Sequence, residues 1–406
     1  MTKNIDFILK KFIIMPMLES TIAIFIPGYY GTTLQDVKSG RLIWGDTKEV
    51  LFGRKTLALP IEGLPIPEAL SLKPFSMIND KKILGGLIRE DAYDKSISLL
   101  NSLGVEKVFP LPWDWRRDPY LGIKALDELV DNCKKNYPRS KLVVVSHSFG
   151  SLIASYYLRY GAMDFSEAIT HGESWKGLKN IDKFILSACP FRGLMAMFRN
   201  MHYGIKFGLN HKMQTALAFS TWESSYYLLP PTGMDLVQNE KGTLESLKLH
   251  DPNEWQKNKF GLFHESSKLK KESESNNEVR FKFVEHHLGR ARKLHTLIES
   301  PIKTRPEQLK PILYLSGGGQ KTVHHGLWLK KPNVFLYYPQ HFKKWKVKLH
   351  PSIVFGEGDA TVPDFSLKLP SFLKKLNTIE ISRQDSHLNV LQSDESQQII
   401  SKFLLS

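Results

Sequence analysis

Cysteine is scarce in this sequence. Its 406 residues include two cysteines, Cys133 and Cys189. The first falls in a predicted surface helix and the second at the end of a predicted buried strand, so we do not expect them to pair. The sequence therefore shows no sign of the disulfide framework on which small secreted domains depend.

Long apolar runs are missing from the first 20 residues. The apolar positions there are interrupted by charges, a proline follows them, and no small-residue cleavage site precedes the first predicted strand. These features favour a short amphipathic helix over a signal peptide or a membrane span. Its apolar side chains either touch a membrane surface or pack on the protein itself; they are Ile5, Ile8, Leu9, Phe12 and Ile13.

Negative charge is in deficit, with 41 Asp and Glu against 56 Lys and Arg and a formal net charge of +15. Such a balance suits nucleic acid, anionic membranes or acidic substrates. Because no nucleic-acid recognition motif accompanies the charge, nucleic acid is the least expected partner. The stretch 341–348 mixes aromatic and basic residues, which suits a lipid interface, although a solvated edge strand has the same pattern.

The sequence also shows no metal-ligand spacing and no internal repeat. The stretch 141–158 is the most informative about function. It begins with an apolar β-branched run, turns sharply around Ser148, and continues with apolar residues at helical spacing. Strand, tight turn and helix with a serine at the apex form the nucleophile elbow of an α/β-hydrolase. Small residues must flank the turn, and Ser146 and Gly150 occupy positions that are usually both glycine.

The rest of the chain alternates predicted strands and helices around this elbow. This alternation predicts a mostly parallel, doubly wound α/β sheet with an inserted cap and a lid excursion. The predicted strands lie within 21–26, 107–116, 142–145, 181–190, 311–320, 352–363 and 378–382, and the predicted core helices within 91–103, 120–136 and 397–405.

Four regions follow from this pattern. Residues 1–20 form the amphipathic segment and 21–190 the first part of the hydrolase core, with a lid at about 35–86 that lacks a clean period. Residues 191–306 form a cap in which the strand–helix rhythm stops, and 307–406 complete the core. Trp222 and Tyr226 are among the cap residues that either line an acyl groove or pack the cap's own core.

The chemistry of a serine nucleophile needs partners, and the sequence supplies them in the expected order. A base must lie within hydrogen-bond reach of the hydroxyl, and a carboxylate must orient that base. After Ser148 come Asp359, in a turn that follows an apolar run, and His387, before the final helix. Glu357 and Asp364 are rival acids close to Asp359. His147, beside the nucleophile, is not expected to be the base.

A glycine-containing loop, 27–33, directly follows the first predicted strand. Hydrolases of this fold place half of the oxyanion hole there, because a backbone N–H must point at the developing negative charge. Tyr29 and Gly28 are the two candidates for that N–H, and we expect the second N–H from Phe149, the residue after the serine.

Taken together, these motifs resemble the lecithin:cholesterol acyltransferase-like family. The resemblance rests on residues 26–31, 112–116, 146–150, 188–193, 227–230 and 356–363 and on His387, in the family's order across nearly the whole chain. It implies that Ser148 is the nucleophile, Asp359 the acid and His387 the base, with Tyr29 and Phe149 at the oxyanion hole. It also implies that Trp44 is a lid residue that contacts membrane or acyl chain.

Two departures from the family pattern stand out. Ser146 replaces the first elbow glycine, and the lid disulfide of secreted members has no cysteines here. The second departure favours a reducing compartment, so we expect a cytoplasmic protein, with peripheral membrane contact as a further option.

The leading functional hypothesis is a serine acyl hydrolase or O-acyltransferase that acts on glycerolipids without metal or cofactor. A carboxylesterase or thioesterase for small soluble acyl groups is the second hypothesis. The third is a hydrolase-fold protein without turnover that docks on anionic membrane through its basic surface.

Overall fold

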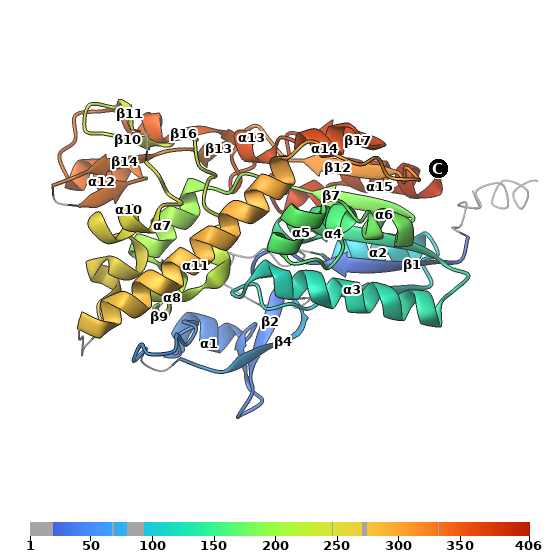
Figure 1. Ribbon diagram of the computed structural model, residues 1–406, viewed down its shortest axis with the longest axis horizontal. Helices are drawn as coiled ribbons and strands as arrows, with labels where there is room; N and C mark the ends of the chain where they lie inside the picture. The colour runs from blue at the N-terminus through green and yellow to red at the C-terminus, as the bar shows by residue number, and fades with distance from the viewer. Residues whose placement is uncertain (1–18, 67–68, 79–92, 246, 270–273, 332) are drawn as a thin grey trace, which may run out of the picture.

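A computed structural model describes residues 19–66, 69–78, 93–245, 247–269, 274–331 and 333–406. Within these residues a six-stranded parallel sheet runs through the molecule (Figure 1), in the order β17-β12-β7-β6-β1-β5. The strands are β1 (Thr21–Ile26), β5 (Lys107–Pro110), β6 (Lys141–His147), β7 (Lys183–Ser187), β12 (Ile312–Ser316) and β17 (Thr378–Ser382). The predicted mostly parallel, doubly wound sheet is confirmed.

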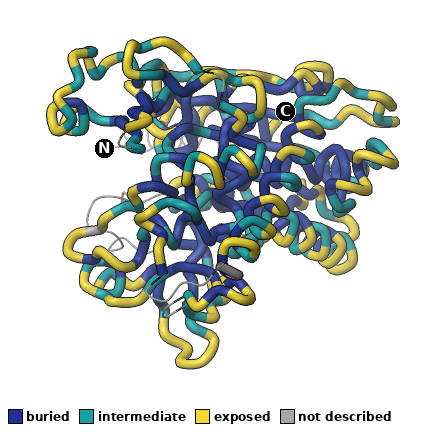
Figure 2. The backbone as a smooth tube through the Cα atoms, turned by 60° about the vertical axis from the view of Figure 1, so that its left-hand side comes forward, coloured by how far each residue is buried: buried dark blue, intermediate teal, exposed yellow. Residues whose placement is uncertain are grey.

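Strand β1 shows why the sheet is covered on both faces. Its alternate residues Ile22, Ile24 and Ile26 pack in one apolar cluster, while Ala23 and Phe25 pack in another on the opposite face. A strand that is buried on both sides reads as a continuous apolar run, which is typical of parallel sheets. The tube in Figure 2 is accordingly buried along its interior and exposed along its outer helices and loops.

Helices cover each of these two faces. One apolar cluster includes residues of α3 (Pro119–Asn136), α4 (Phe149–Tyr160), α5 (Phe165–His171) and α6 (Lys176–Asn180). The other includes residues of α2 (Asp94–Ser102) and α15 (Asp394–Leu405). Helix α3 begins because Asp118 caps it by accepting the Tyr120 N–H, with a proline at its first position. No helix in the described part of the chain combines the length and the apolar content needed to cross a bilayer.

The excursion after β1 is more regular than its sequence indicates. Strands β2 (Thr32–Asp36), β3 (Leu42–Trp44) and β4 (Leu72–Met77) form an antiparallel sheet in the order β3-β2-β4, with α1 (Thr47–Phe52) beside it. The expectation of an irregular segment is therefore wrong for this part of the predicted lid. Residues 67–68 and 79–86 of the predicted lid, and residues 1–18 of the predicted N-terminal segment, lie outside the described residues.

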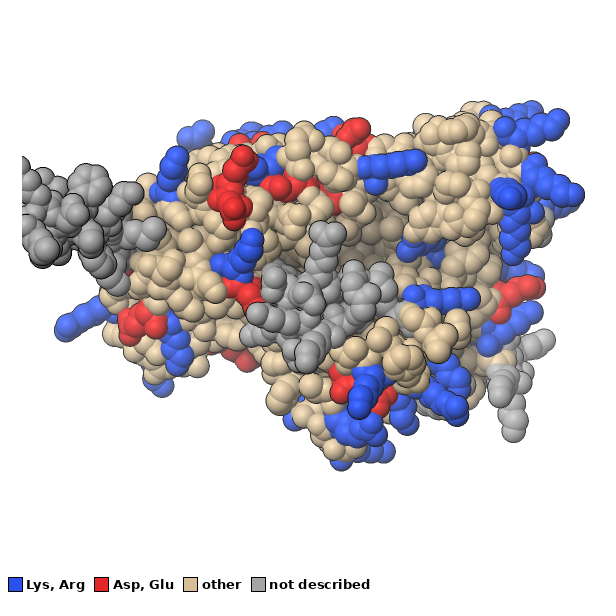
Figure 3. Space-filling model, turned by 180° about the vertical axis from the view of Figure 1, so that it is seen from behind, with Lys and Arg blue, Asp and Glu red and all other residues tan. Residues whose placement is uncertain are grey.

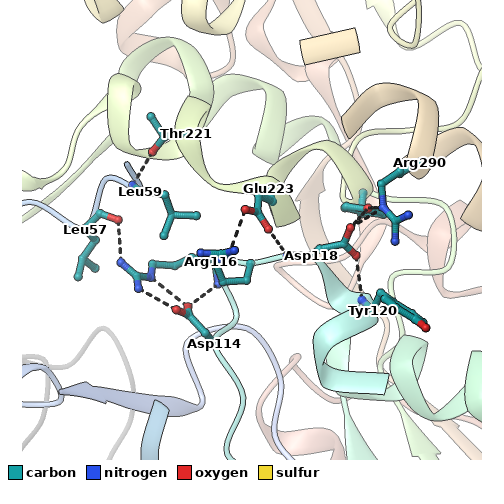
Figure 4. Close-up of polar contacts among 11 residues, drawn as sticks. Leu57, Leu59, Asp114, Arg116, Asp118, Tyr120, Thr221, Glu223 and Arg290 are labelled. Carbon is teal, nitrogen blue, oxygen red and sulfur yellow. Dashed lines mark hydrogen bonds and ion pairs between the residues drawn. The ribbon is translucent and has the colours of Figure 1, made fainter. Parts of the chain in front are cut away.

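Hydrogen bonds fasten this excursion to the rest of the fold (Figure 4). Arg116 donates from Nη1 to the Leu57 carbonyl at 3.1 Å, and the Leu59 N–H donates to Thr221 Oγ1 at 2.9 Å. Arg116 is almost fully buried and is held in turn by the carboxylate of Asp114 at 2.7 Å. The contacts join the excursion to the loop after β5 and to the cap.

The region predicted as a cap contains several helices. They are α7 (Met195–Tyr203), α8 (Ala216–Thr221), α9 (Glu223–Tyr227), α10 (Pro252–Lys257) and the long α11 (Glu274–Glu299), with the hairpin β8 (Ile205–Phe207) and β9 (Asn210–Gln214). Helix α11 spans 26 residues. Its Arg290 pairs with Asp118 at 2.6 Å and with Asp164 at 2.8 Å, which binds the cap to the core.

The cap also draws on chain that the sequence assigned to the second part of the core. Strands β10 (Val237–Gln238) and β11 (Leu244–Glu245) form a sheet with β14 (Gly326–Leu329) and β15 (Val334–Leu336). Strands β13 (Gln320–Val323) and β16 (Phe355–Gly358) pair only with each other among the described residues, so the predicted core strand within 352–363 is not in the central sheet. The basic stretch predicted at 341–348 begins in α12 (Pro339–Lys344), which rules out the edge-strand interpretation.

Candidate active site

Ser148 lies at the turn between β6 and α4, in a strained backbone conformation with φ 53° and ψ −126°. Such angles are rare in a residue other than glycine and cost about 1–3 kcal/mol, which surrounding contacts must offset. The Ser148 N–H donates to the Ser187 carbonyl at 2.8 Å, which ties the turn to β7. A Cβ on Gly150 would lie 2.6 Å from the carbonyl oxygens of Ile26 and Pro27, so this position requires glycine.

The serine that replaces the first elbow glycine is accommodated by hydrogen bonding. Ser146 is fully buried, and its Oγ donates to the Ile185 carbonyl at 3.1 Å and lies 3.0 Å from Ser151 Oγ. A buried hydroxyl that forms hydrogen bonds avoids the free-energy cost of an unsatisfied polar group. The departure from the family pattern therefore leaves the elbow geometry intact.

The structure brings the three predicted reacting residues together although they are far apart in sequence. His387 Nε2 lies 2.9 Å from Ser148 Oγ, and His387 Nδ1 lies 2.7 Å from Asp359 Oδ2. Asp359 is fully buried, and its other oxygen accepts backbone N–H groups from Thr361 and Val362 at 3.0 and 2.6 Å. The His387 N–H donates to the Asp359 carbonyl at 2.8 Å, which fixes the two loops relative to each other.

The two rival acids lie elsewhere. Glu357 is exposed at the edge formed by β16. Asp364 lies at the start of α13 (Asp364–Leu367) and faces Lys368 at 3.8 Å and His324 at 3.4 Å. Of the three acidic residues that the sequence left open, only Asp359 contacts His387.

The loop after β1 presents a free backbone N–H beside the serine. The Gly28 N–H donates to Tyr93 Oη at 3.0 Å, so it is already occupied. The N–H groups of Tyr29 and Phe149 have no acceptor among the described residues, and Phe149 begins α4, where the first N–H groups lack helical partners. A Cβ on Gly28 would lie 2.7 Å from Ser148 Cβ, so the close approach of loop and serine depends on glycine there.

A buried hydrogen-bonded chain connects this loop to His387 through His147. His147 Nε2–H donates to the His387 carbonyl at 2.9 Å, and its Nδ1 accepts from Tyr93 Oη–H at 3.2 Å. Burial, and secondarily the neighbouring His387, lowers the pKa of His147 to about 3, so this ring is neutral near pH 7. As expected, His147 is not the partner of Ser148; instead it holds the backbone of His387.

Two tryptophans donate hydrogen bonds to the same loop. Trp113 Nε1 donates to the Pro27 carbonyl at 3.1 Å, and Trp115 Nε1 donates to the Thr32 carbonyl at 3.0 Å. Both side chains are buried, and Trp115 also packs 5.0 Å from the ring of Tyr29. The motif at residues 112–116 thus supports the loop that carries the Tyr29 N–H.

A cavity of about 380 Å³ opens at Ser148 and His387, within the usual range for small-molecule sites. Most of its wall is apolar, and the apolar residues come from the loop after β4, the cap and β13; they include Ile78, Leu194, Met197, Ile205, Leu228 and Val323. Its polar side chains besides the reacting residues include Arg199 and Asn200 of α7.

The three residues proposed as substrate or lid contacts lie elsewhere. Trp44, Trp222 and Tyr226 are fully buried and none lines the cavity. Trp44 Nε1 donates to the Tyr30 carbonyl at 3.0 Å, and Trp222 Nε1 donates to the Leu57 carbonyl at 2.7 Å. The ring of Tyr226 packs against that of Trp255 inside the cap, with 5.5 Å between the ring centres. Core packing, the alternative weighed for the cap aromatics, replaces the substrate-contact prediction for all three.

Comparison with known proteins now adds to this geometry. The profile of the family described as Lecithin:cholesterol acyltransferase matches residues 76–399. The chain belongs to this family. The resemblance seen in the motifs is therefore confirmed, and the protein is an enzyme of the acyl hydrolase and acyltransferase class. A search of curated protein sequences gives no match.

One solved structure supports the fold of this family member, and two others are more distant. A crystal structure of a Tle4–Tli4 complex has a chain with TM-score 0.57 and 12% identity, over 96% of this chain and 98% of that one. A prodiginine-pathway thioesterase from Streptomyces coelicolor has TM-score 0.28 and 10% identity, over 95% and 89% of the two chains. MenH from S. aureus has TM-score 0.28 and 12% identity, over 95% and 94%. The first similarity establishes a shared fold only, and the other two are too distant to support an argument.

Sequence reasoning missed Tyr93, Arg199 and the roles of Trp113 and Trp115 at this site. Tyr93 lies in an ordinary amphipathic pattern, and nothing near it indicates that its hydroxyl reaches Gly28 from 65 residues away. The two tryptophans were recognised as part of a family motif, but their target in the loop 27–32 depends on the fold.

Proposed function

We propose that this protein is a serine-dependent acyl hydrolase or O-acyltransferase that acts on glycerolipids. The observation that carries the proposal is the continuous hydrogen-bonded series from Ser148 Oγ through His387 to the buried Asp359, at an apolar cavity. Family membership supports acyl transfer as the reaction class.

In the proposed reaction, His387 accepts the Ser148 proton as the hydroxyl attacks the carbonyl carbon of an acyl ester. Asp359 keeps His387 Nδ1 protonated and stabilises the imidazolium that forms. The N–H groups of Tyr29 and Phe149 hydrogen-bond the oxygen that becomes negative in the tetrahedral intermediate. His387 then protonates the leaving alcohol, and an acyl group remains on Ser148.

Water or a lipid hydroxyl accepts the acyl group in the second half of the reaction. His387 deprotonates that acceptor, and the same two N–H groups stabilise the second tetrahedral intermediate. The acyl group leaves as a free acid or as a new ester, and Ser148 is restored.

The glycerolipid assignment is supported by the cavity and by the surface near it. The apolar wall suits an acyl chain. Tyr338 lines the cavity and also caps α12, whose exposed Lys343 and Lys344 are followed by the half-buried Trp345. Rings and basic side chains together suit anionic headgroups, so we propose that this end contacts the membrane peripherally.

Mixed vesicles of phospholipid and a lipid alcohol test the proposal. We expect the wild-type protein to release free fatty acid, form transacylated product, or do both, and the Ser148→Ala variant to do neither. Activity confined to short soluble esters would instead favour a carboxylesterase. Absence of turnover and of fluorophosphonate labelling in a folded protein would indicate a binding protein.

A further inference from the structure

Arg199 is a half-buried arginine in the wall of the active-site cavity, and no Asp or Glu among the described residues pairs with it. It projects from α7 together with Met197 and Asn200, which line the same cavity. Its Nε donates to Asn200 Oδ1 at 2.8 Å and its Nη2 donates to the same oxygen. A guanidinium has five N–H groups, and the remaining three have no acceptor among the described residues.

Other arginines with buried or half-buried side chains have carboxylate partners. Arg116, Arg159, Arg192 and Arg290 each pair with an Asp or Glu at 2.6 to 2.9 Å. Removing a charge from water without a counter-charge is costly, so folds supply one wherever the charge is merely structural. For Arg199 the described part of the chain supplies none.

The groups around Arg199 are aromatic or basic. The guanidinium lies 5.1 Å from the Tyr338 ring centre, and Tyr30, Tyr337 and His341 are its other neighbours. Burial lowers the pKa of the Arg199 guanidinium, which stays far above neutral pH in any protein environment. Tyr30 donates its hydroxyl proton to Gln214 Oε1 at 2.9 Å. A permanent positive charge thus faces the cavity.

We propose that Arg199 binds the phosphate of a glycerophospholipid whose acyl ester lies at Ser148. A guanidinium presents paired N–H groups that match two phosphate oxygens. In a glycerophospholipid the phosphate and the acyl esters share one glycerol unit, so both fit a single cavity. Figure 3 shows many basic side chains and few acidic ones at the cap end of the molecule. Positive charge is therefore concentrated outside the cavity as well. This inference rests on the proposed function and names the residue that recognises the phosphate of its substrate.

Matched soluble substrates test the inference. A short-chain phosphatidylglycerol and a diacylglycerol with the same acyl chains, both below their aggregation limits, differ by the phosphate-bearing headgroup. For Arg199→Met we expect kcat/KM on the phospholipid to fall about 30-fold or more, and on the diacylglycerol to change less than about threefold. Arg199→Lys keeps the charge without the fork and is expected to lie between.

Arg305, an exposed arginine in the loop before β12, provides the control. Arg305→Gln should leave both rates unchanged. Equal losses on both substrates for Arg199→Met, or no loss on either, would overturn the role of Arg199 while leaving Ser148 as nucleophile. Stronger inhibition of wild type than of Arg199→Met by free fatty acid, with unchanged phospholipid preference, would assign Arg199 to a carboxylate and also overturn the proposal.

Binding separates this inference from the proposed function. An ether-linked phosphatidylglycerol cannot be hydrolysed, and its affinity for Ser148→Ala reports recognition without turnover. We expect binding that weakens about 30-fold when Arg199→Met is added, and no such change for the ether-linked glycerol that lacks phosphate. If wild type is inactive on every ester, the proposed function fails, and this affinity comparison still decides the role of Arg199.

Discussion

At the scale of single residues, the site depends on Asp359 holding His387 in one orientation. Asp359→Asn would replace a charged acceptor at 2.7 Å by an amide and favour the wrong tautomer of the ring. In serine hydrolases this change lowers kcat by about 10⁴-fold with little structural change, and we expect a similar loss here. Initial rates on an acyl ester measure it.

Asp364→Asn is the matched control, because this acid contacts Lys368 and His324 instead of His387. It should retain wild-type rates within about twofold, as surface substitutions usually do. A larger loss for Asp364→Asn than for Asp359→Asn would show that the acid has been assigned to the wrong residue.

Gly28 is a second residue with a definite prediction. Its absent Cβ would lie 2.7 Å from Ser148 Cβ, so Gly28→Ala must push the Tyr29 N–H away from the serine. Because displacements near 1 Å cost about 10²-fold in rate, we expect kcat to fall by about that factor while the fold is retained. Gly289→Ala, whose Cβ would meet nothing within 4 Å, is the control and should keep full activity. Equal rates for the two variants would argue against an oxyanion role for this loop.

At the scale of elements, α11 links the cap to the core through Arg290. Its two ion pairs, with Asp118 and Asp164, are largely shielded from solvent. Arg290→Met would leave both carboxylates without this partner, and breaking such pairs costs about 3 kcal/mol. We expect a lower thermal midpoint, measured by calorimetry or circular dichroism.

Lys282→Met on the same helix is the control, since its pair with Glu278 is exposed at both ends. Exposed pairs contribute about 0–1 kcal/mol, so its midpoint should stay near that of wild type. Equal shifts for the two variants would mean that Arg290 does not fasten the cap.

Elements also show where sequence reasoning succeeded and where it stopped. Strand β1 and the β6–α4 elbow were predictable because their apolar periodicity and turn residues are local signals. Strands β2 to β4 were not, since a short antiparallel sheet interrupted by a helix leaves no long period. Strand β16 was taken for a central strand because an apolar run does not reveal its pairing partner, which is β13.

Some residues of the candidate site could be predicted from the sequence and others could not. The order of Ser148, Asp359 and His387 is a property of the fold and can be read from the sequence, and these side chains do lie within hydrogen-bond distance of one another. Trp44 and Trp222 could not be placed, because an aromatic residue has the same local pattern in a core as in a lid. Arg199 could not be identified from the sequence, because only the folded structure shows that no carboxylate of the described residues pairs with it.

At the scale of the whole molecule, buried histidines predict sensitivity to acid. Burial lowers the pKa of His147, His202, His287 and His295 to about 3 and that of His250 to about 4, from 6.5. The unfolded chain therefore binds protons first as the pH falls. The stability that these neutral rings confer is fully present above about pH 6.5 and is lost as the pH drops toward 3.

Each such histidine adds about 1.4 kcal/mol per pH unit to the slope of unfolding free energy in that window. Denaturant titrations at pH 7, 6 and 5 measure the slope. His295→Gln should reduce it by about one histidine's share, whatever the variant's absolute stability. A wild-type free energy that stays flat from pH 6.5 to 4.5 would contradict the burial of these rings.

The proposed reaction requires an acyl group on Ser148, and rapid acid quench followed by peptide mass spectrometry looks for it. During turnover of an acyl ester, we predict one acyl group on the peptide that contains Ser148, and none on Ser148→Ala. Turnover with no acyl group on that peptide, or with the acyl group on another residue, would contradict the assignment of Ser148 as the nucleophile.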